Sequence, residues 1–234
     1  MFDKYETMGA YHWRECDRGS NQYNPPLAAR YEAVIKRAPK GRILDVGAGD
    51  GYLSGRLAAV ARQVDSIEYE ESGVELARKM LEGRTNVTVH QGDSYALPFE
   101  NGVFDGVVMA DVIEHLETPE QAVREMARVS TKDGVTLVST PHWRPDRVWD
   151  TRHVKEFTAE ELRELLSVGF DSVEMVFCWP RFWSDFYRTP IGWRGLRLLG
   201  RMGLNPFTRE SQTADGFCQI IAICRQPKPA SRAR

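Results

Sequence analysis

Glycines at alternate positions follow an acidic residue early in the chain, at Asp45, Gly47, Gly49 and Gly51. An apolar run precedes the acid and apolar residues at helical spacing follow the last glycine, so the glycines stand where a strand turns into a helix. Glycine permits the sharp turn and lets a ligand approach the backbone without meeting a Cβ. The first turn of the helix adds free N–H groups and a partial positive charge. The pattern predicts a loop that binds a nucleotide-type cofactor.

A second group of reactive side chains stands at Asp111, Glu114 and His115, with His142 and His153 farther along. Two carboxyl groups and an imidazole so close in the sequence can face one point. An imidazole can take a proton from a nucleophile as a general base. Carboxylates suit Mg²⁺, which can bind a hydroxyl and make it more acidic. The group is therefore a candidate for proton transfer, with or without a metal ion.

The elements that must position these groups alternate between strand and helix in short βαβ units. Such alternation predicts a mostly parallel sheet with helices on both faces. The expected fold class is α/β, a Rossmann-like doubly wound sheet of seven strands. After a first strand that ends at the glycine loop, strands are expected at residues 63–68, 86–91, 104–110, 134–140, 170–178 and 217–224.

Local sequence signals predict where several helices begin. Asn24-Pro25-Pro26 precedes apolar residues at helical spacing, and proline is favoured in the first turn of a helix. A hydroxyl residue with Glu or Gln three positions later indicates a capping box. Such pairs occur at Ser72 and Glu75, at Thr118 and Gln121, and at Thr158 and Glu161.

Length, charge and cysteine usage limit the function. The chain has 234 residues and a net charge of −2, without a long basic stripe, which disfavours nucleic acid as a partner. The four cysteines are scattered without a C-x-x-C pair, so reduced thiols are expected. The first residues lack the apolar core of a signal peptide, and a cytoplasmic location is expected.

The acid-x-Gly-x-Gly-x-Gly pattern from Asp45 to Gly51 resembles the class I S-adenosylmethionine-dependent methyltransferases. The dinucleotide fingerprint differs, because its third glycine stands one residue later. The resemblance covers Ile43 to about Val176 well, and Phe217 to Cys224 loosely. It implies S-adenosyl-L-methionine as the cofactor and a seventh strand that runs antiparallel to its neighbours.

The same resemblance assigns residues to parts of the cofactor. Glu68 ends a strand about twenty residues after the glycine loop, where such folds place a carboxylate on the ribose hydroxyls. Asp93 follows a glycine after the third strand, where the family accepts a hydrogen bond from the adenine amino group. The expected cofactor-binding residues are Asp45, Gly47, Ala48, Gly49, Glu68, Tyr69, Asp93, Ser94, Ala110 and Asp111.

The segment Asp111-x-x-Glu114-His115 resembles the acid-x-x-Glu-His segment of the ubiquinone-pathway O-methyltransferases. It is also similar to the small-RNA 3′-end ribose methyltransferases, which hold Mg²⁺ with that segment and a downstream histidine, here His153. His115 and His153 are the expected catalytic residues, as candidate bases for the acceptor proton. The resemblance implies Asp111, Glu114, His115 and His153 as metal ligands, although Asp111 is one methylene shorter than the usual Glu. The alternative is that these residues border the pocket without a metal.

The resemblance fails before Ile43 and again in the long connection at 179–216, and long connections of this kind are usually functional. From Trp179 to Arg209 this connection holds six Arg against one Asp. It is expected to cover the substrate, with Trp183, Phe186 and Tyr187 as an apolar wall. A second interpretation is peripheral membrane contact through 179–209. The expected domains are an N-terminal lid or helix at 1–40, a methyltransferase domain at 41–226 that contains this insertion, and a disordered tail at 227–234.

The expected function is methyl transfer from S-adenosyl-L-methionine to a small-molecule acceptor, at a hydroxyl. A glycan, a glycolipid, a quinone-like compound and a specialised metabolite all remain open as acceptors. One alternative is an RNA ribose methyltransferase with a metal site. Another is a non-catalytic cofactor-binding partner subunit. The sequence does not indicate an oligomeric state.

Overall fold

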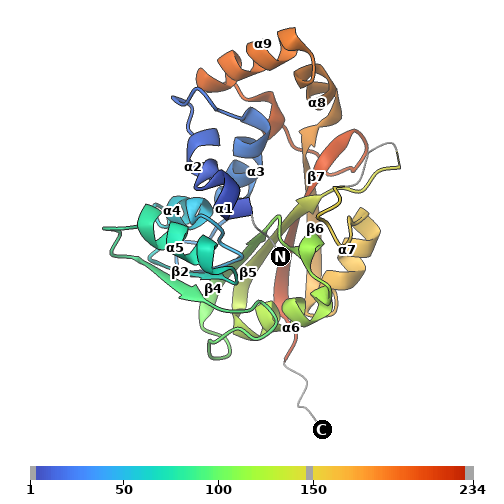
Figure 1. The fold of residues 1–234 in the computed structure, drawn as a ribbon. Helices are drawn as coiled ribbons and strands as arrows, with labels where there is room; N and C mark the ends of the chain where they lie inside the picture. The colour runs from blue at the N-terminus through green and yellow to red at the C-terminus, as the bar shows by residue number, and fades with distance from the viewer. Residues whose placement is uncertain (1–3, 146–149, 230–234) are drawn as a thin grey trace.

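A computed structural model describes residues 4–145 and 150–229 of the chain. Within these residues a single mixed sheet of seven strands forms the centre of the molecule, in the order β3-β2-β1-β4-β5-β7-β6 (Figure 1). The strands are β1 (Arg42–Val46), β2 (Gln63–Glu68), β3 (Val87–Gln91), β4 (Phe104–Ala110), β5 (Ser130–Pro141), β6 (Phe170–Pro180) and β7 (Phe217–Pro227).

Strand direction follows the expectation for the fold class. The four neighbouring strand pairs from β3 to β5 in the sheet order run parallel. Strand β7 lies between β5 and β6 and runs antiparallel to both. The antiparallel seventh strand and the Rossmann-like α/β class are therefore confirmed. The order of strands reverses at β1, between β2 and β4, and such a switch point leaves a crevice at the carboxyl ends of the strands.

Helices cover both faces of the sheet. Apolar residues of α3 and α4 pack on one face, and those of α6 and α7 pack on the other. Along β4, Val107 and Met109 face the α6 and α7 side, while Val108 faces α3 and α4. A strand buried on both faces explains the continuous apolar sequence of β4. The helices on the two faces are α3 (Pro25–Ile35), α4 (Tyr52–Leu57), α6 (Pro119–Val129) and α7 (Ala159–Leu166).

The remaining helices are short or lie at the periphery. Within the described residues no helix is long and apolar enough to cross a bilayer. All four cysteines are buried free thiols. The remaining helical elements are α1 (Lys4–Met8), α2 (Tyr11–Glu15), α5 (Glu71–Met80), η1 (Ile113–His115), α8 (Arg181–Tyr187), α9 (Pro190–Arg201) and η2 (Pro206–Thr208).

Two of the expected helix starts are confirmed in full. The Asn24 side chain accepts a hydrogen bond from the Leu27 N–H, and two prolines open α3 as expected. The capping box of Thr158 and Glu161 is complete, because each side chain accepts from the backbone N–H of the other residue.

The predictions of the other two capping boxes, at Ser72 and at Thr118, are wrong. Helix α5 begins at Glu71, before Ser72, and its start has no side-chain cap. Thr118 does stand at the N-cap of α6, but its side chain caps nothing there. The Gln121 amide donates instead to the Tyr95 carbonyl at 3.0 Å. A tertiary contact has thus replaced the local hydrogen bond that the sequence pattern suggests.

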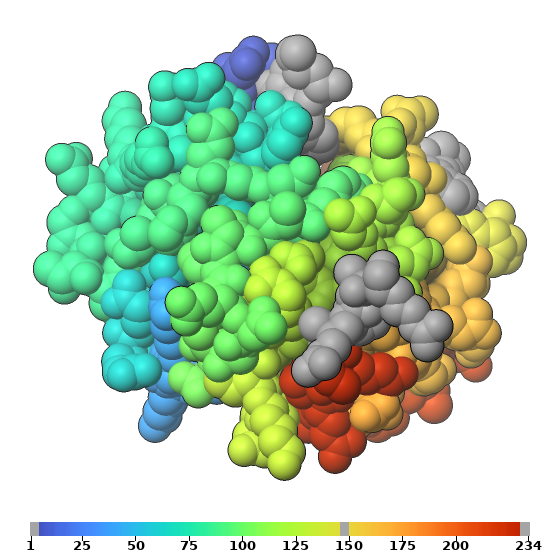
Figure 2. Space-filling view, turned by 90° about the horizontal axis from the view of Figure 1, so that it is seen from below, coloured from blue at the N-terminus to red at the C-terminus, as the bar shows by residue number. Residues whose placement is uncertain are grey.

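The 179–216 connection folds into α8, α9 and η2, which lie at one end of the molecule beside α3 (Figure 1). Figure 2 shows the opposite end, where the start of β5 and the end of β7 lie together. The Asn205 side chain joins the connection to α3, because its amide donates to the Pro25 carbonyl at 2.9 Å. Residues 230–234 of the expected tail lie outside the described residues, and Pro227 belongs to β7.

Asn205→Ala should destabilise the protein by about 1–3 kcal/mol, because Asn205 is buried and bonds both the Pro25 carbonyl and the Phe207 N–H. Urea denaturation measures the change. Gln212→Ala, at an exposed position of the same connection, is the matched control and should change stability by less than about 0.5 kcal/mol. Equal effects of the two substitutions would mean that Asn205 does not dock the connection on α3.

Candidate functional site

A cavity of about 920 Å³ opens at the carboxyl ends of β1, β2 and β4. Its walls come from the glycine loop, from the ends of these strands, from the N-terminal helices and from η1. Nine of the ten expected cofactor residues line it. They are Asp45, Gly47, Ala48, Glu68, Tyr69, Asp93, Ser94, Ala110 and Asp111.

Crowding around the glycine loop explains two of its glycines. Gly47 has φ of 76° and Gly49 has φ of 55°, in the left-handed region that L side chains rarely adopt. A Cβ on Gly47 would come within 2.5 Å of the Val112 side chain. A Cβ on Gly49 would overlap the Tyr5 hydroxyl. The loop is therefore closed to larger residues by its neighbours as well as by its backbone.

Glu68 is held by backbone N–H groups at the edge of the cavity. Its Oε2 accepts from the Gly49 N–H at 2.8 Å, and its Oε1 accepts from Tyr69 and Glu70 at 2.9 and 3.0 Å. Burial raises the pKa of this carboxyl, and the three N–H donors oppose that effect only in part. Gly49 itself does not line the cavity, but it orients Glu68, which does.

Asp45 is buried at the floor of the cavity. Its carboxylate accepts a hydrogen bond from the Ser54 hydroxyl at 2.5 Å, and Ser54 accepts in turn from Ser66 at 2.7 Å. Burial raises the pKa of Asp45 to about 7, and the hydrogen bond from Ser54 opposes the rise. Without a ligand, this carboxyl is therefore protonated over much of the acidic range.

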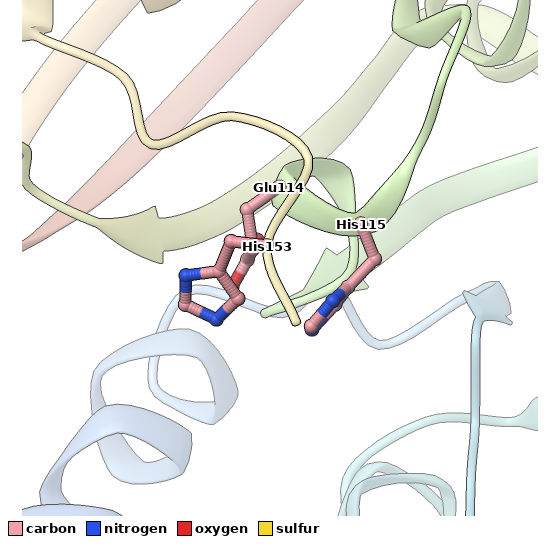
Figure 3. Close-up of side chains that lie close together, drawn as sticks. All are labelled: Glu114, His115 and His153. Carbon is pink, nitrogen blue, oxygen red and sulfur yellow. The ribbon is translucent and has the colours of Figure 1, made fainter. Parts of the chain in front are cut away.

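Glu114, His115 and His153 meet at the other end of the cavity (Figure 3). One potential ligand atom from each lies within 4.8 Å of the others. The two imidazoles approach edge to face, with ring centroids 4.8 Å apart. Glu114 is almost fully buried and accepts from the Thr140 hydroxyl at 2.9 Å. Burial, reinforced by the Asp111 carboxylate, raises the pKa of Glu114 to about 8.

Neighbouring oxygens fix the orientation of both imidazoles. His115 Nδ1 lies 3.0 Å from the Arg152 carbonyl, and His153 Nδ1 lies 2.8 Å from the Glu156 carboxylate. A carbonyl can only accept, so His115 carries a hydrogen on Nδ1, and the carboxylate favours the same tautomer for His153. In that tautomer Nε2 holds the lone pair of each ring, as a general base or a metal ligand requires.

Asp111 lies near this group but is engaged elsewhere. It pairs with Arg30 at 2.8 Å and accepts from Ser139 and Gln219 at 3.3 and 2.5 Å. The structure thus brings together three of the four expected metal ligands and leaves Asp111 in a separate ion pair. His142 is not among the described residues that line the cavity, and its Nδ1 lies 3.3 Å from the Phe217 carbonyl.

Several cavity residues are missed by reasoning from the sequence. The N-terminal helices supply aromatic and charged side chains that close one side, and Trp179 reaches the cavity from the end of β6. The only sequence signal for them is a high density of aromatic residues before the first strand. The apolar wall expected from Trp183, Phe186 and Tyr187 is wrong, because none of the three is among the described residues that line the cavity. Trp183 and Tyr187 pack instead against a buried cluster that includes Leu196 and Phe207, and Phe186 is exposed. The missed residues that line the cavity include Tyr5, Tyr11, His12, Arg30, Tyr31, Asp50 and Trp179.

Comparison with known proteins agrees with this geometry. A family model described as a methyltransferase domain matches residues 44–138. A probable S-adenosylmethionine-dependent methyltransferase of Mycobacterium tuberculosis is 37% identical over 153 residues, which cover 62% of this chain and 54% of the relative. A demethylmenaquinone methyltransferase of Clavibacter sepedonicus is 32% identical over 194 residues, which cover 82% of this chain and 75% of the relative.

A solved structure gives the same result for the fold. Phosphoethanolamine N-methyltransferase 2 of Haemonchus contortus, in complex with S-adenosyl-L-methionine, superposes with a TM-score of 0.70 at 17% identity. The match covers 97% of this chain and 59% of that chain. At this identity the likeness concerns the fold alone. The chain spans about half the length of the mycobacterial relative, 54% by the aligned share.

The buried Asp45 carboxyl should make stability depend on pH. Its folded pKa of about 7 lies above the unfolded value of about 3.9, so its contribution is complete below pH 4 and is lost as pH rises to 7. Asp45→Asn stays neutral, so the free energy of unfolding of this variant minus that of the wild type should grow by roughly 3–4 kcal/mol over this range. Chemical denaturation without ligand, at several pH values, measures the difference.

Asp133→Asn provides the control, because Asp133 is exposed on β5. Its difference from the wild type should change little over the same pH range. An Asp45→Asn difference that stays constant from pH 4 to 8 would contradict a buried, neutral carboxyl at this position.

Proposed function

The chain belongs to the class I S-adenosylmethionine-dependent methyltransferase family, and we propose that it transfers the methyl group to a hydroxyl of a small-molecule acceptor. The observation that carries the proposal is one continuous cavity that contains both the expected cofactor residues and the Glu114, His115 and His153 group. A cofactor at the glycine loop would then share the cavity with candidate bases.

The residues present fit the cofactor. The cavity of about 920 Å³ is lined by Gly47 and Ala48 of the glycine loop together with Asp45 and Glu68. We assign Glu68 to the ribose hydroxyls, Asp93 to the adenine amino group and Asp45 to the end that carries the ammonium. These carboxyl groups suit a ligand with hydroxyl, amino and cationic groups. A pyrophosphate beside them would be repelled, which argues against a dinucleotide.

We attribute most of the rate enhancement to the positioning of the acceptor hydroxyl against the methyl group. When bound, S-adenosyl-L-methionine supplies a methyl carbon on a positively charged sulfur, which a hydroxyl oxygen displaces directly. Walls that align the acceptor and exclude water can contribute roughly 7–11 kcal/mol. Nε2 of His115 or His153 is assigned to take the hydroxyl proton, and a positioned base adds a factor of about 10²–10⁴. Glu156 would stabilise the imidazolium that forms on His153.

A second candidate uses the same side chains to hold a divalent metal. Glu114, His115 and His153 offer one oxygen and two nitrogen atoms within 4.8 Å. Mg²⁺ prefers oxygen ligands, whereas imidazole suits Zn, Fe and Ni ions. Because Asp111 is paired with Arg30, this donor set fits Mg²⁺ less well than it fits a metal that accepts imidazole. A metal here would bind the acceptor hydroxyl and lower its pKa.

Two segments are proposed to cover the acceptor. Residues 1–40 place Tyr11, Arg30 and Tyr31 on the cavity wall, and the insertion at 179–216 reaches it through Trp179. Against an RNA acceptor stand the net charge of −2 and the lack of a long basic stripe. A partner subunit without turnover would bind the cofactor but transfer no label, so the transfer assay below separates that alternative.

Glu68→Ala should weaken binding of S-adenosyl-L-methionine at least about tenfold. Hydrogen bonds to a charged carboxylate contribute about 1.5–3 kcal/mol each, and 1.4 kcal/mol is tenfold in affinity. Isothermal titration calorimetry measures the loss. Glu75→Gln, at an exposed position of α5, should bind like the wild type. Tight binding of a nicotinamide dinucleotide by the wild type, without heat from S-adenosyl-L-methionine, would refute the assignment.

His115→Ala and His153→Ala should lower the rate of methyl transfer about 10²–10⁴-fold while cofactor affinity stays near that of the wild type. Transfer of labelled methyl to lipid, RNA, protein and small-molecule fractions of a cell extract identifies the acceptor class and measures the rate. His142→Ala is the matched control, because His142 lies outside the described cavity wall.

A chelator separates the two candidate roles of the histidines. Loss of transfer with excess chelator, and its return with added metal, would support the metal site. Full transfer in excess chelator would leave the histidines as bases. Transfer that survives both histidine substitutions would contradict both roles.

A further inference from the structure

Helices α8 and α9 and the turn after them carry five large apolar side chains that face solvent, at Phe182, Ile191, Leu198, Met202 and Leu204. These five residues are called the outer apolar surface. Ile191, Leu198 and Met202 share one face of α9, because helix positions seven and eleven residues apart return to the same side. Single exposed apolar residues are ordinary, but several large ones on one face indicate a contact with another body. The exposed fractions are 70% for Phe182, 77% for Ile191, 60% for Leu198, 67% for Met202 and 62% for Leu204.

The way α9 docks explains why this surface is left open. Gly192, Leu196 and Gly200, spaced by one helical turn, face the body of the protein and are buried. A Cβ on Gly200 would come within 2.8 Å of the Tyr23 ring, so the helix lies close to its neighbour through small residues. The opposite side of α9 then presents Ile191 and Met202 outward.

Arg181 pairs with Asp185 at 3.5 Å, and four further arginines of this segment fall into two groups. Arg197 and Arg201 donate to the backbone carbonyls of Asn21 and Ser20, so they hold α9 on the N-terminal region. Arg188 and Arg194 are exposed, and no described carboxylate pairs with either. The segment therefore combines exposed apolar groups with exposed positive charge, the combination that an anionic lipid surface attracts.

We propose that the outer apolar surface, with Arg188 and Arg194, binds an anionic membrane surface. A second copy of the chain is a poorer occupant, because a two-fold contact would bring two copies of the same positively charged surface together. Helix α8 directly follows β6, whose Trp179 lines the cavity, so the membrane would lie beside the wall proposed to cover the acceptor. The inference concerns the surface and needs no methyl transfer to hold.

Sedimentation with phosphatidylcholine vesicles, with and without phosphatidylglycerol, tests the proposal. The wild type should bind the vesicles that contain phosphatidylglycerol, and salt should weaken the binding. Each arginine near such a surface contributes about fivefold in affinity, so Arg188→Gln with Arg194→Gln should reduce binding roughly 30-fold. Replacing the same two residues by Lys keeps the charge and should keep most of the binding.

A second variant tests the apolar part. Ile191→Ser, Leu198→Ser and Met202→Ser together should reduce vesicle binding at least about tenfold, because less apolar surface enters the lipid. Val60→Ser, an exposed apolar residue elsewhere, is the control and should bind as the wild type does. All these positions are exposed, so the melting temperature should stay unchanged, and this is checked for each variant.

Vesicle binding that is unchanged in the serine variant, or absent in the wild type, would overturn the proposal. A wild-type dimer that the same serine substitutions dissociate, together with no vesicle binding, would assign the surface to a second copy instead. Vesicle binding without any affinity for S-adenosyl-L-methionine would leave this inference standing and refute the proposed function alone.

Discussion

The hydrogen bond from the Gly49 N–H to the Glu68 carboxylate joins the two elements on which the cavity depends. It fixes the end of β2 to the loop after β1, and the backbone N–H groups of Tyr69 and Glu70 bind the other carboxylate oxygen. Gly49, which donates this hydrogen bond, has a left-handed backbone with φ of 55°. Tyr5 then covers the same glycine from the N-terminal side. The positions of the glycine loop, the end of β2 and Tyr5 therefore depend on one another.

The electrostatics of the cavity follow from how its carboxyl groups are paired. Asp111 has Arg30 as a partner, and Asp50 has His12. Among the described residues Asp45, Glu68 and Glu114 receive hydrogen bonds from neutral donors only, and burial raises the pKa of each. A cationic ligand would lower these pKa values and restore the charged forms. An uncompensated group of buried acids is therefore suited to a sulfonium and ammonium ligand, and poorly suited to an anionic one.

The sheet and the cofactor loop could be predicted because their signals are local. Alternation of strands and helices, the glycine spacing and the acid at Glu68 depend on a few neighbouring residues each. The Arg30 and Asp111 ion pair joins residues far apart in the sequence, and so does the approach of Tyr5 to Gly49. No periodic pattern in the sequence indicates such long-range contacts. The sequence therefore predicted the floor of the cavity well, while its N-terminal wall and the pairing of Asp111 became known only from the structure.

Helix α9 shows the same limit in a way that bears on function. Its pattern of large apolar residues favours burial of Leu196, Leu199 and Met202, yet only Leu196 is buried and glycines fill the other inward positions. Gly200 permits the close approach to Tyr23, and Gly192 permits the close approach to the Phe186 carbonyl, so the larger apolar side chains are left on the outside. A helix that served only as a lid would gain stability by placing its large apolar residues inward. An apolar partner on the outer side would bury these side chains and add to the stability of this arrangement.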